Sequence, residues 1–124
     1  MERERASRAS LHGIKPMPAA RARVQIERAF TADEVSRLEM GMIPTSMDDH
    51  WFAFAEGDWL YFHRSWSGIC KYMLSIVRAD DGSARIGEAW ANAQERVTII
   101  PNYDARMLRY LVERVLGNDW PFPT

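Results

Sequence analysis

The segment from Trp51 to Ile76 constrains the fold most, because it combines strand-forming residues with two short turn signals. Aromatic and aliphatic residues dominate the segment, and glycine interrupts it in Gly57-Asp58 and in Ser67-Gly68. A glycine in a two-residue connection supplies the positive φ that tight hairpin turns require. The pattern therefore predicts an antiparallel meander, with strands at residues 51–56, 59–66 and 69–77.

The flanking segments predict a further strand at each side and two helices. Residues 21–30 alternate between polar and apolar side chains, as a short edge strand does, and residues 84–91 follow a turn rich in aspartate. A later run, at 97–100, is a candidate fifth strand of the meander.

Helix signals stand on both sides of the meander. Thr31 and Glu34 have the spacing of a capping box, which predicts a short helix over residues 32–40. Apolar residues at helical spacing predict a second helix after Asn102, which is a plausible N-cap. The fold class predicted is α+β: an antiparallel meander of four to five strands with a short helix in its N-terminal half and a C-terminal amphipathic helix.

The first 20 residues differ from the rest of the chain. They are crowded with charged groups, and Gly13, Pro16 and Pro18 interrupt any helix. We expect residues 1–20 to form a flexible N-terminal arm that folding does not need. Residues 21–124 are then expected to form a single α+β domain.

Composition narrows the class of partner and the compartment. The net charge of −1 makes a general nucleic-acid binder an unlikely class, since such proteins carry a basic surplus. The single cysteine, Cys70, excludes an internal disulfide and fits a reducing compartment. No apolar run reaches the roughly 18 residues of a membrane helix. We expect a cytoplasmic protein that does not contact a membrane.

Two-residue connections at both turns would fix which side chains share a face of the sheet. Phe52 then lies opposite His63, and Arg64 lies opposite Lys71. One face, read as the core, carries Phe52, Phe54, Tyr61, His63, Ser65, Cys70, Tyr72, Leu74 and Ile76. The other face carries Trp51, Ala53, Ala55, Leu60, Phe62, Arg64, Trp66, Ile69, Lys71 and Met73.

The most polar part of this sheet is the predicted ligand site. Two cations facing each other across strands are unfavourable unless an anion lies between them, and arginine suits phosphate or carboxylate. Tryptophan can stack a base or sugar, and a serine–glycine turn offers hydrogen-bond donors. The predicted ligand-binding residues are Arg64, Lys71, Trp51, Trp66, Ser67, Gly68 and His63. Alternatively, Arg64 pairs with Asp48, Asp49 or Asp58 and only closes the sheet.

Catalytic and metal-binding patterns are weak. His63 and Ser65 share a strand, whereas a nucleophile and its base normally come from different elements. A buried, hydrogen-bonded His63 and a core Cys70 are therefore the favoured readings. His12, His50 and His63 have no metal-ligand spacing. We expect no cofactor, no metal and no catalytic residue.

Three functions from different classes remain open. The first is a non-catalytic binding domain for an anionic ligand, nucleotide-like or an acidic segment of a partner. The second is an interaction or assembly module, a homo-oligomer built on exposed aromatic residues and the tail Pro121-Phe122-Pro123. The third is a small hydrolase that uses His63 with a carboxylate such as Glu88.

The hairpin also resembles a small bacterial family whose function is uncharacterised. Members carry a tryptophan-rich hairpin that ends in His-Arg-Ser-Trp, then serine or threonine, then glycine; here that run is His63 to Gly68. Glu88-Ala89-Trp90 and Tyr103-Asp104-Ala105 are similar as well. Where the family pattern has Asn-Arg-Asp after the fourth strand, this chain has Asn92-Ala93-Gln94. The resemblance implies no activity or ligand.

Overall fold

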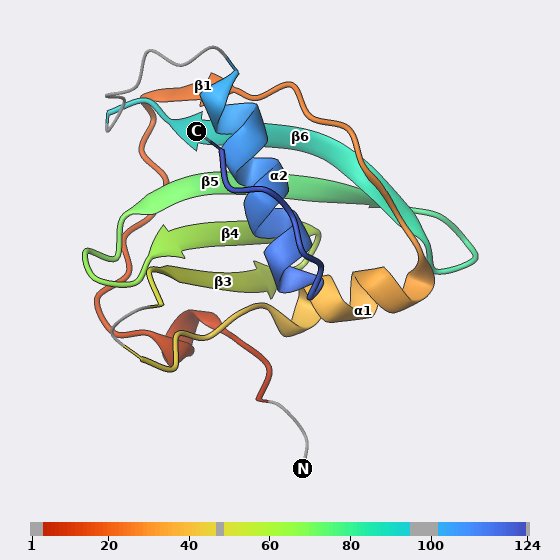
Figure 1. Cartoon of the computed structure of the whole chain (residues 1–124), viewed down its shortest axis with the longest axis horizontal. Helices are drawn as coiled ribbons and strands as arrows, with labels where there is room; N and C mark the ends of the chain where they lie inside the picture. Colours follow the sequence, from red (N-terminus) through yellow and green to blue (C-terminus); the bar gives the residue numbers. More distant parts are fainter. Residues whose placement is uncertain (1–3, 47–48, 95–101, 124) are drawn as a thin grey trace.

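The computed structural model, which describes residues 4–46, 49–94 and 102–123, is an antiparallel sheet with two helices (Figure 1). The sheet order is β1-β6-β5-β4-β3, and β2 also pairs with β6. The elements are a 3-10 turn (Arg8–Ser10), β1 (Arg21–Arg23), β2 (Ala29–Phe30), α1 (Ala32–Met40), β3 (Trp51–Glu56), β4 (Trp59–Arg64), β5 (Cys70–Arg78), β6 (Ala84–Asn92) and α2 (Tyr103–Val115).

The predicted α+β meander is confirmed, with changes at its ends. The expected strand over residues 21–30 is two short strands, β1 and β2, on the same neighbour, β6. The candidate strand at 97–100 lies outside the described residues. Asn102 is the N-cap of α2 but has a left-handed backbone (φ 58°), and its side chain does not cap the helix.

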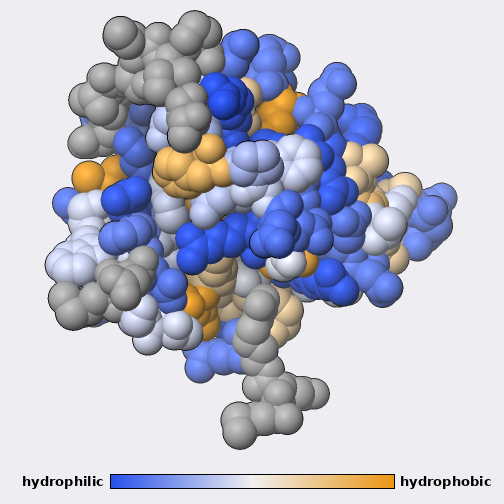
Figure 2. All heavy atoms as spheres, in the orientation of Figure 1, coloured by the Kyte–Doolittle hydropathy of each residue, from blue (hydrophilic) through white to orange (hydrophobic). Residues whose placement is uncertain are grey.

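Helix α2 crosses one face of the sheet, which we call the helix face (Figure 1). This face carries Trp51, Phe62 and Leu74. Leu108, Leu111 and Val112 of α2 are fully buried against it, and α1 adds Val35 and Leu38. Burying one such side chain contributes about 1.5–3 kcal/mol, so this layer is the main core. The solvent-facing surface on the α2 side of the molecule is mostly hydrophilic (Figure 2).

The start of α1 has the capping box that the sequence predicts. Thr31 Oγ1 accepts a hydrogen bond from the Glu34 amide at 3.2 Å, and Glu34 Oε1 accepts one from the Thr31 amide at 3.0 Å. Phe30 and Val35 are both buried beside it, as a hydrophobic staple requires. Local sequence therefore determines where this helix begins.

We expect Thr31→Ala to lower the free energy of unfolding by about 1 kcal/mol, because the Glu34 amide loses its acceptor. Ser36→Ala, in the exposed middle of the same helix, is the matched control. Urea denaturation measures both variants. A Thr31→Ala midpoint equal to that of the parent would show that the cap adds nothing.

The connection between β4 and β5 differs from the prediction. Ser67-Gly68 is not a two-residue hairpin loop: β4 ends at Arg64, β5 begins at Cys70, and the Arg64 amide donates to the Ile69 carbonyl at 2.9 Å. A register shift follows, so that His63 lies opposite Cys70 but Phe62 lies opposite Tyr72. The extra residue of this bulge is Lys71. A one-residue shift moves the rest of a strand to the other face.

The bulge corrects the predicted faces. Tyr72, Leu74 and Ile76, expected beside Phe52, belong instead to the core under α2. The β3–β4 pairing is as predicted, with Phe52 opposite His63 and Phe54 opposite Tyr61. The sheet thus has two apolar faces rather than one.

The second face, which we call the arm face, carries Phe52, Phe54 and His63, and residues 4–15 cover that part of it. Ala6 is fully buried there with both phenylalanines, and Leu11 and Ile14 pack at the border. The Ala6 amide donates to Met40 O at 2.7 Å, and the Lys15 amide donates to Gly68 O at 2.8 Å. Residues 4–20 then continue to β1 at the opposite edge of the sheet (Figure 1).

These contacts differ from the flexible arm that the sequence predicts. Two glycines let residues 4–15 lie close to the sheet. A Cβ at Gly68 would collide with the Gly13 carbonyl, and a Cβ at Gly41 would lie 2.8 Å from the Ala6 Cβ. Only a few side chains of the segment point inward, so its charged composition did not reveal that it packs.

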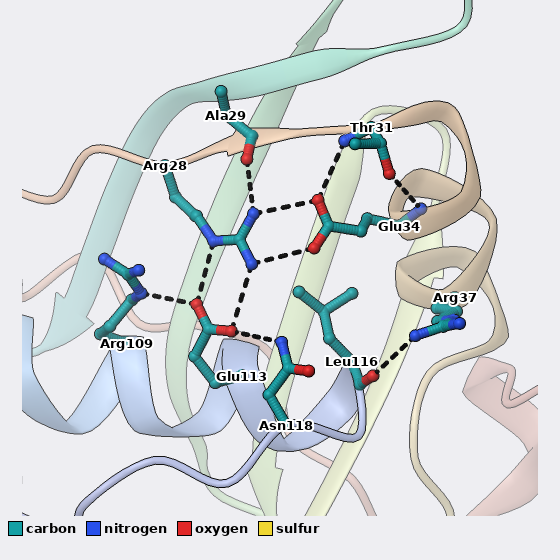
Figure 3. Close-up of polar contacts among 9 residues, drawn as sticks. All are labelled: Arg28, Ala29, Thr31, Glu34, Arg37, Arg109, Glu113, Leu116 and Asn118. Atoms are coloured by element: carbon teal, nitrogen blue, oxygen red, sulfur yellow. Dashed lines mark hydrogen bonds and ion pairs between the residues drawn. The ribbon is translucent and has the colours of Figure 1, made fainter.

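A buried ionic network joins α1, α2 and the strand before α1 (Figure 3). The Glu113 side chain is 2% exposed and accepts hydrogen bonds from Arg28 at 2.9 Å, Arg109 at 2.7 Å and Asn118 at 2.8 Å. Arg28 also binds both carboxylate oxygens of Glu34, at 3.0 Å each. Glu113 is not one of the apolar residues whose spacing predicts α2, yet it is buried as deeply as they are. The network links the capping box to the C-terminal helix.

The helices of the described part of the chain are all too short and too polar to cross a membrane.

Candidate functional site

The end of the sheet where β3 begins and β4 ends brings two of the predicted site residues together. Trp51 and Arg64 are directly opposite in the β3–β4 pair and lie on the helix face. The Arg64 guanidinium carbon is 5.0 Å from the centre of the Trp51 ring. The ring itself is 6% exposed. Trp51 therefore supports the guanidinium and offers little free surface of its own.

Two further side chains lie beside this pair, and the sequence analysis did not select them. The Tyr72 ring stacks on Trp51 with centroids 6.2 Å apart. Its hydroxyl donates a hydrogen bond to Asp104 Oδ1, in the first turn of α2, at 3.0 Å. We call Trp51, Arg64, Tyr72 and Asp104 the Trp51 site. It combines a cation, an aromatic support and a carboxylate from three strands and a helix.

No carboxylate in residues 4–46, 49–94 and 102–123 forms an ion pair with Arg64 at 4.0 Å or less. Asp49 is occupied by Thr45 and Arg114; its hydrogen bonds from Thr45 lower the pKa of its carboxyl group. Asp58 pairs with Arg78 at 2.8 Å. The third alternative partner, Asp48, lies outside the described residues. Arg64 is half-buried, so its charge is available at this end of the sheet.

Lys71 does not lie opposite Arg64, as the sequence analysis expected. The predicted pairing needed a two-residue loop, whereas Lys71 lies in the β5 bulge. The argument that two facing cations require an anion between them is therefore wrong for this pair. Arg64 is a candidate because it has no ion-pair partner in the described residues and lies on Trp51.

The turn after β4 carries three other predicted site residues, and these differ in their exposure to solvent. Trp66 is 66% exposed, the largest exposure among the large apolar side chains of the described chain. The Ser67 hydroxyl accepts a hydrogen bond from the Ile69 amide at 3.2 Å, which stabilises the turn. Gly68 is buried and contacts the N-terminal segment. Of these three residues, Trp66 alone presents a large side chain to solvent.

His63 lies on the arm face, away from Arg64. It is 2% exposed, and its Nδ1 lies 3.0 Å from the Gly68 carbonyl. Because a carbonyl only accepts, the ring must donate from Nδ1. Burial lowers the pKa of His63, and the Gly68 carbonyl opposes this only in part. The side chain is thus a neutral structural histidine at the base of the turn.

The pair proposed for hydrolysis is not formed. His63 bonds to Gly68, and Glu88 accepts from the Trp90 indole at 3.2 Å. Cys70 is buried, as predicted, and burial raises the pKa of its thiol to about 12. Such a thiol is not a nucleophile near neutral pH. Within the part of the chain that the structure describes, no three His, Cys, Asp or Glu side chains gather as metal ligands.

Comparisons with protein-family models, with curated proteins and with solved structures found no match to this chain. The resemblance of the His63–Gly68 run to a small bacterial family therefore stays a prediction.

Tyr72 and Asp104 had no recognisable signal as site residues. Tyr72 falls on the wrong face when the β4–β5 loop is read as two residues, so the register error concealed it. Asp104 stands in Tyr103-Asp104-Ala105, which the sequence analysis noted only for its family resemblance. Its approach to Tyr72 depends on how α2 crosses the sheet.

Proposed function

We propose that this domain binds an anionic ligand, such as a nucleotide or an acidic segment of a partner, at the Trp51 site. The observation that carries the proposal is the position of Arg64: the residue is half-buried, its guanidinium carbon lies 5.0 Å from the centre of the Trp51 ring, and it has no carboxylate partner among the described residues. A guanidinium in a fixed orientation can bind phosphate or carboxylate through two parallel hydrogen bonds.

Each side chain of the proposed site has a distinct role. Trp51, held by Tyr72, orients Arg64 from one side. Trp66, two residues further along the chain and largely exposed, offers its ring to a planar part of the ligand. The Asp104 carboxylate, which already accepts from Tyr72, suits the hydroxyl groups of a sugar. These features favour a sugar phosphate or nucleotide over a simple inorganic anion.

Binding rather than catalysis is proposed because the groups suited to acid–base chemistry lie elsewhere. His63 is on the opposite face and bonded to Gly68. Tyr72 and Asp104 are bonded to each other, and no described side chain beside them is an activated nucleophile of the kind that a transfer reaction uses.

Arg64→Gln should leave folding almost intact and weaken binding. The loss of one partly exposed contact with Trp51 costs about 0.5–1 kcal/mol of stability. The loss of a hydrogen bond to a charged group, about 1.5–3 kcal/mol, raises the Kd by about tenfold or more. A thermal-shift screen of nucleotides, sugar phosphates and dicarboxylates with the parent selects the ligand, and calorimetry then compares the variants.

Arg85→Gln is the matched control, since Arg85 is exposed on β6 and, among the described residues, its side chain bonds to the Ile86 carbonyl alone. Marked destabilisation of Arg64→Gln, with no ligand found for the parent, would contradict the proposal. In that case the assembly function is favoured. Trp120 and Phe122, in the tail that follows α2, are 41% and 55% exposed, so sedimentation of the parent over a range of concentrations would then test self-association.

A further inference from the structure

The arm face contains a second group of aromatic and basic side chains, centred on β6 and β1, away from the phenylalanines that residues 4–15 cover. The strand registers align five residues in one row across the sheet: Arg23, Trp90, Met73, Tyr61 and Phe54. All five point to the same face because directly paired residues do. This face is the side turned away from the viewer in Figure 1. We call these residues the cross-sheet row.

The N-terminal segment covers only one end of the cross-sheet row. Phe54 is fully buried beneath it, and the Arg8 guanidinium lies 5.3 Å from the Phe54 ring. Tyr61 and Trp90 are half-buried, whereas Arg23 is exposed. The β6 and β1 end of the row is therefore partly open to solvent at Trp90 and Arg23, whereas Met73, between Trp90 and Tyr61, is 8% exposed.

Two arginines meet at the open end. Arg21 and Arg23 lie on β1 with their guanidinium carbons 4.5 Å and 5.5 Å from the centre of the Trp90 ring. Arg21 also reaches across the ring to the Met73 sulfur, at 3.6 Å. Both side chains are thus drawn over the sheet rather than extended into water.

The two cations have no ion-pair partner among the residues that the structure describes. The acidic group beside them is Glu88, whose carboxylate accepts the Trp90 indole N–H at 3.2 Å. Two like charges on one ring repel each other. An anion with several acceptor oxygens, placed between the guanidinium groups, would satisfy both at once.

The row continues past the two arginines to the buried Met73 and then to the half-buried ring of Tyr61. Neighbouring strands are about 4.8 Å apart, so Tyr61 and Trp90, separated by β5, are about 10 Å apart with Met73 between them. A flat ring can lie on such a surface while its charged substituent reaches the edge. The arrangement pairs a stacking surface with a phosphate-sized site at one end.

We propose that the open half of the cross-sheet row is a nucleotide-phosphate site. The phosphate group lies between Arg21 and Arg23, and the base lies towards the half-buried Tyr61, beyond the buried Met73. This site is on the opposite face from Arg64 and does not depend on the function proposed above. The same chemistry is present in a free nucleotide and in a terminal residue of single-stranded nucleic acid.

The indole N–H signals of the tryptophans in a proton–nitrogen NMR spectrum test the proposal on the whole chain. Trp90→Phe assigns the Trp90 signal. AMP, inorganic phosphate and a thymidine oligonucleotide are titrated separately to millimolar concentration. We expect AMP to shift the Trp90 signal saturably and more tightly than inorganic phosphate does. A tighter effect of the oligonucleotide would identify nucleic acid as the source of the ligand.

Arg21→Gln with Arg23→Gln should weaken the AMP effect at Trp90 at least tenfold. The control variant, Arg5→Gln with Arg85→Gln, removes the same charge from other exposed positions and should change the affinity for AMP measured at Trp90 less than twofold. Arg64→Gln, on the other face, should also change this affinity less than twofold. The proposal is overturned if no probe shifts the Trp90 signal, if the double variant at 21 and 23 keeps the parental affinity, or if phosphate alone binds as tightly as AMP. Retained dispersion of the other signals confirms that each variant is folded.

Discussion

Deletion of residues 1–20 should lower the melting temperature by about 10 °C or more, or leave too little soluble protein to measure. The segment buries Ala6 with Phe52 and Phe54, and all three are fully buried in the structure. Uncovering a phenylalanine costs about 1.5–3 kcal/mol. Two of them amount to a large share of the 5–15 kcal/mol that stabilises a typical domain. Calorimetry of the truncated and full chains measures the effect.

A single substitution tests whether the effect of the deletion comes from the packing of Ala6 against the sheet. Ala6→Glu places a charge under the sheet and should destabilise nearly as much as the deletion. Ala9→Glu, three residues along and exposed, makes the same chemical change and should have almost no effect. The ion pair of Arg8 with Glu56 is about half exposed on both sides and contributes little. Equal melting temperatures of the truncated and parent chains would restore the prediction of a dispensable arm.

Glu113→Gln should lower the free energy of unfolding by about 1.5–3 kcal/mol at neutral pH, because charge-assisted hydrogen bonds are lost, Arg109 loses its carboxylate partner and Arg28 keeps only Glu34. The glutamate accepts from Arg28, Arg109 and Asn118 (Figure 3). An amide in its place has one acceptor oxygen and points two hydrogens at donors. Glu27→Gln, at an exposed glutamate, is the control. Urea denaturation measures both variants.

The pKa of Glu113 also predicts how the free energy of unfolding depends on pH. Burial by itself raises the pKa of Glu113, but the hydrogen bonds from Arg28, Asn118 and Arg109 outweigh it and lower the pKa to about 2. A carboxyl group with a depressed pKa in the folded state stabilises above its unfolded pKa, near 4.5. That stability is lost as the pH falls from about 4.5 towards 2. Glu113→Gln should flatten this part of the curve, and an unchanged acid dependence would contradict the assignment.

Local signals were enough for most elements of secondary structure. The Thr31–Glu34 capping box predicted where α1 begins, and Gly57-Asp58 predicted the turn and the register of the β3–β4 hairpin. These signals work because a cap or a two-residue turn is satisfied by residues close in the sequence. The apolar spacing of α2 likewise identified the helix face that enters the core.

The register of β5 could not be read in the same way. Ser67-Gly68 resembles a hairpin turn, but the chain makes a longer connection and places Lys71 in a bulge. Gly68 has a positive φ as expected, yet its closeness to Gly13 and its hydrogen bond from Lys15 come from a distant segment. Contacts with a distant segment, rather than the turn preference of Ser67-Gly68, therefore accompany the β4–β5 connection and the register of β5.

Part of the candidate site followed from sequence. Trp51 and Arg64 were paired through the hairpin register, and they meet as expected on one face. The approach of Tyr72 and Asp104 could not be predicted, since it requires the bulge and the path of α2. The alignment of Arg23 with Trp90 depends equally on how β1 pairs with β6.

The sequence by itself determined the α+β class, the positions of the helices and the β3–β4 register, because these depend on contacts between residues near one another in the chain. The tertiary structure alone decided what covers each side of the sheet. Phe52 and Phe54 face the N-terminal segment, and Glu113 faces Arg28 rather than water. Such contacts join residues far apart in the sequence, and their free energy comes from burial and charge pairing that no local pattern records.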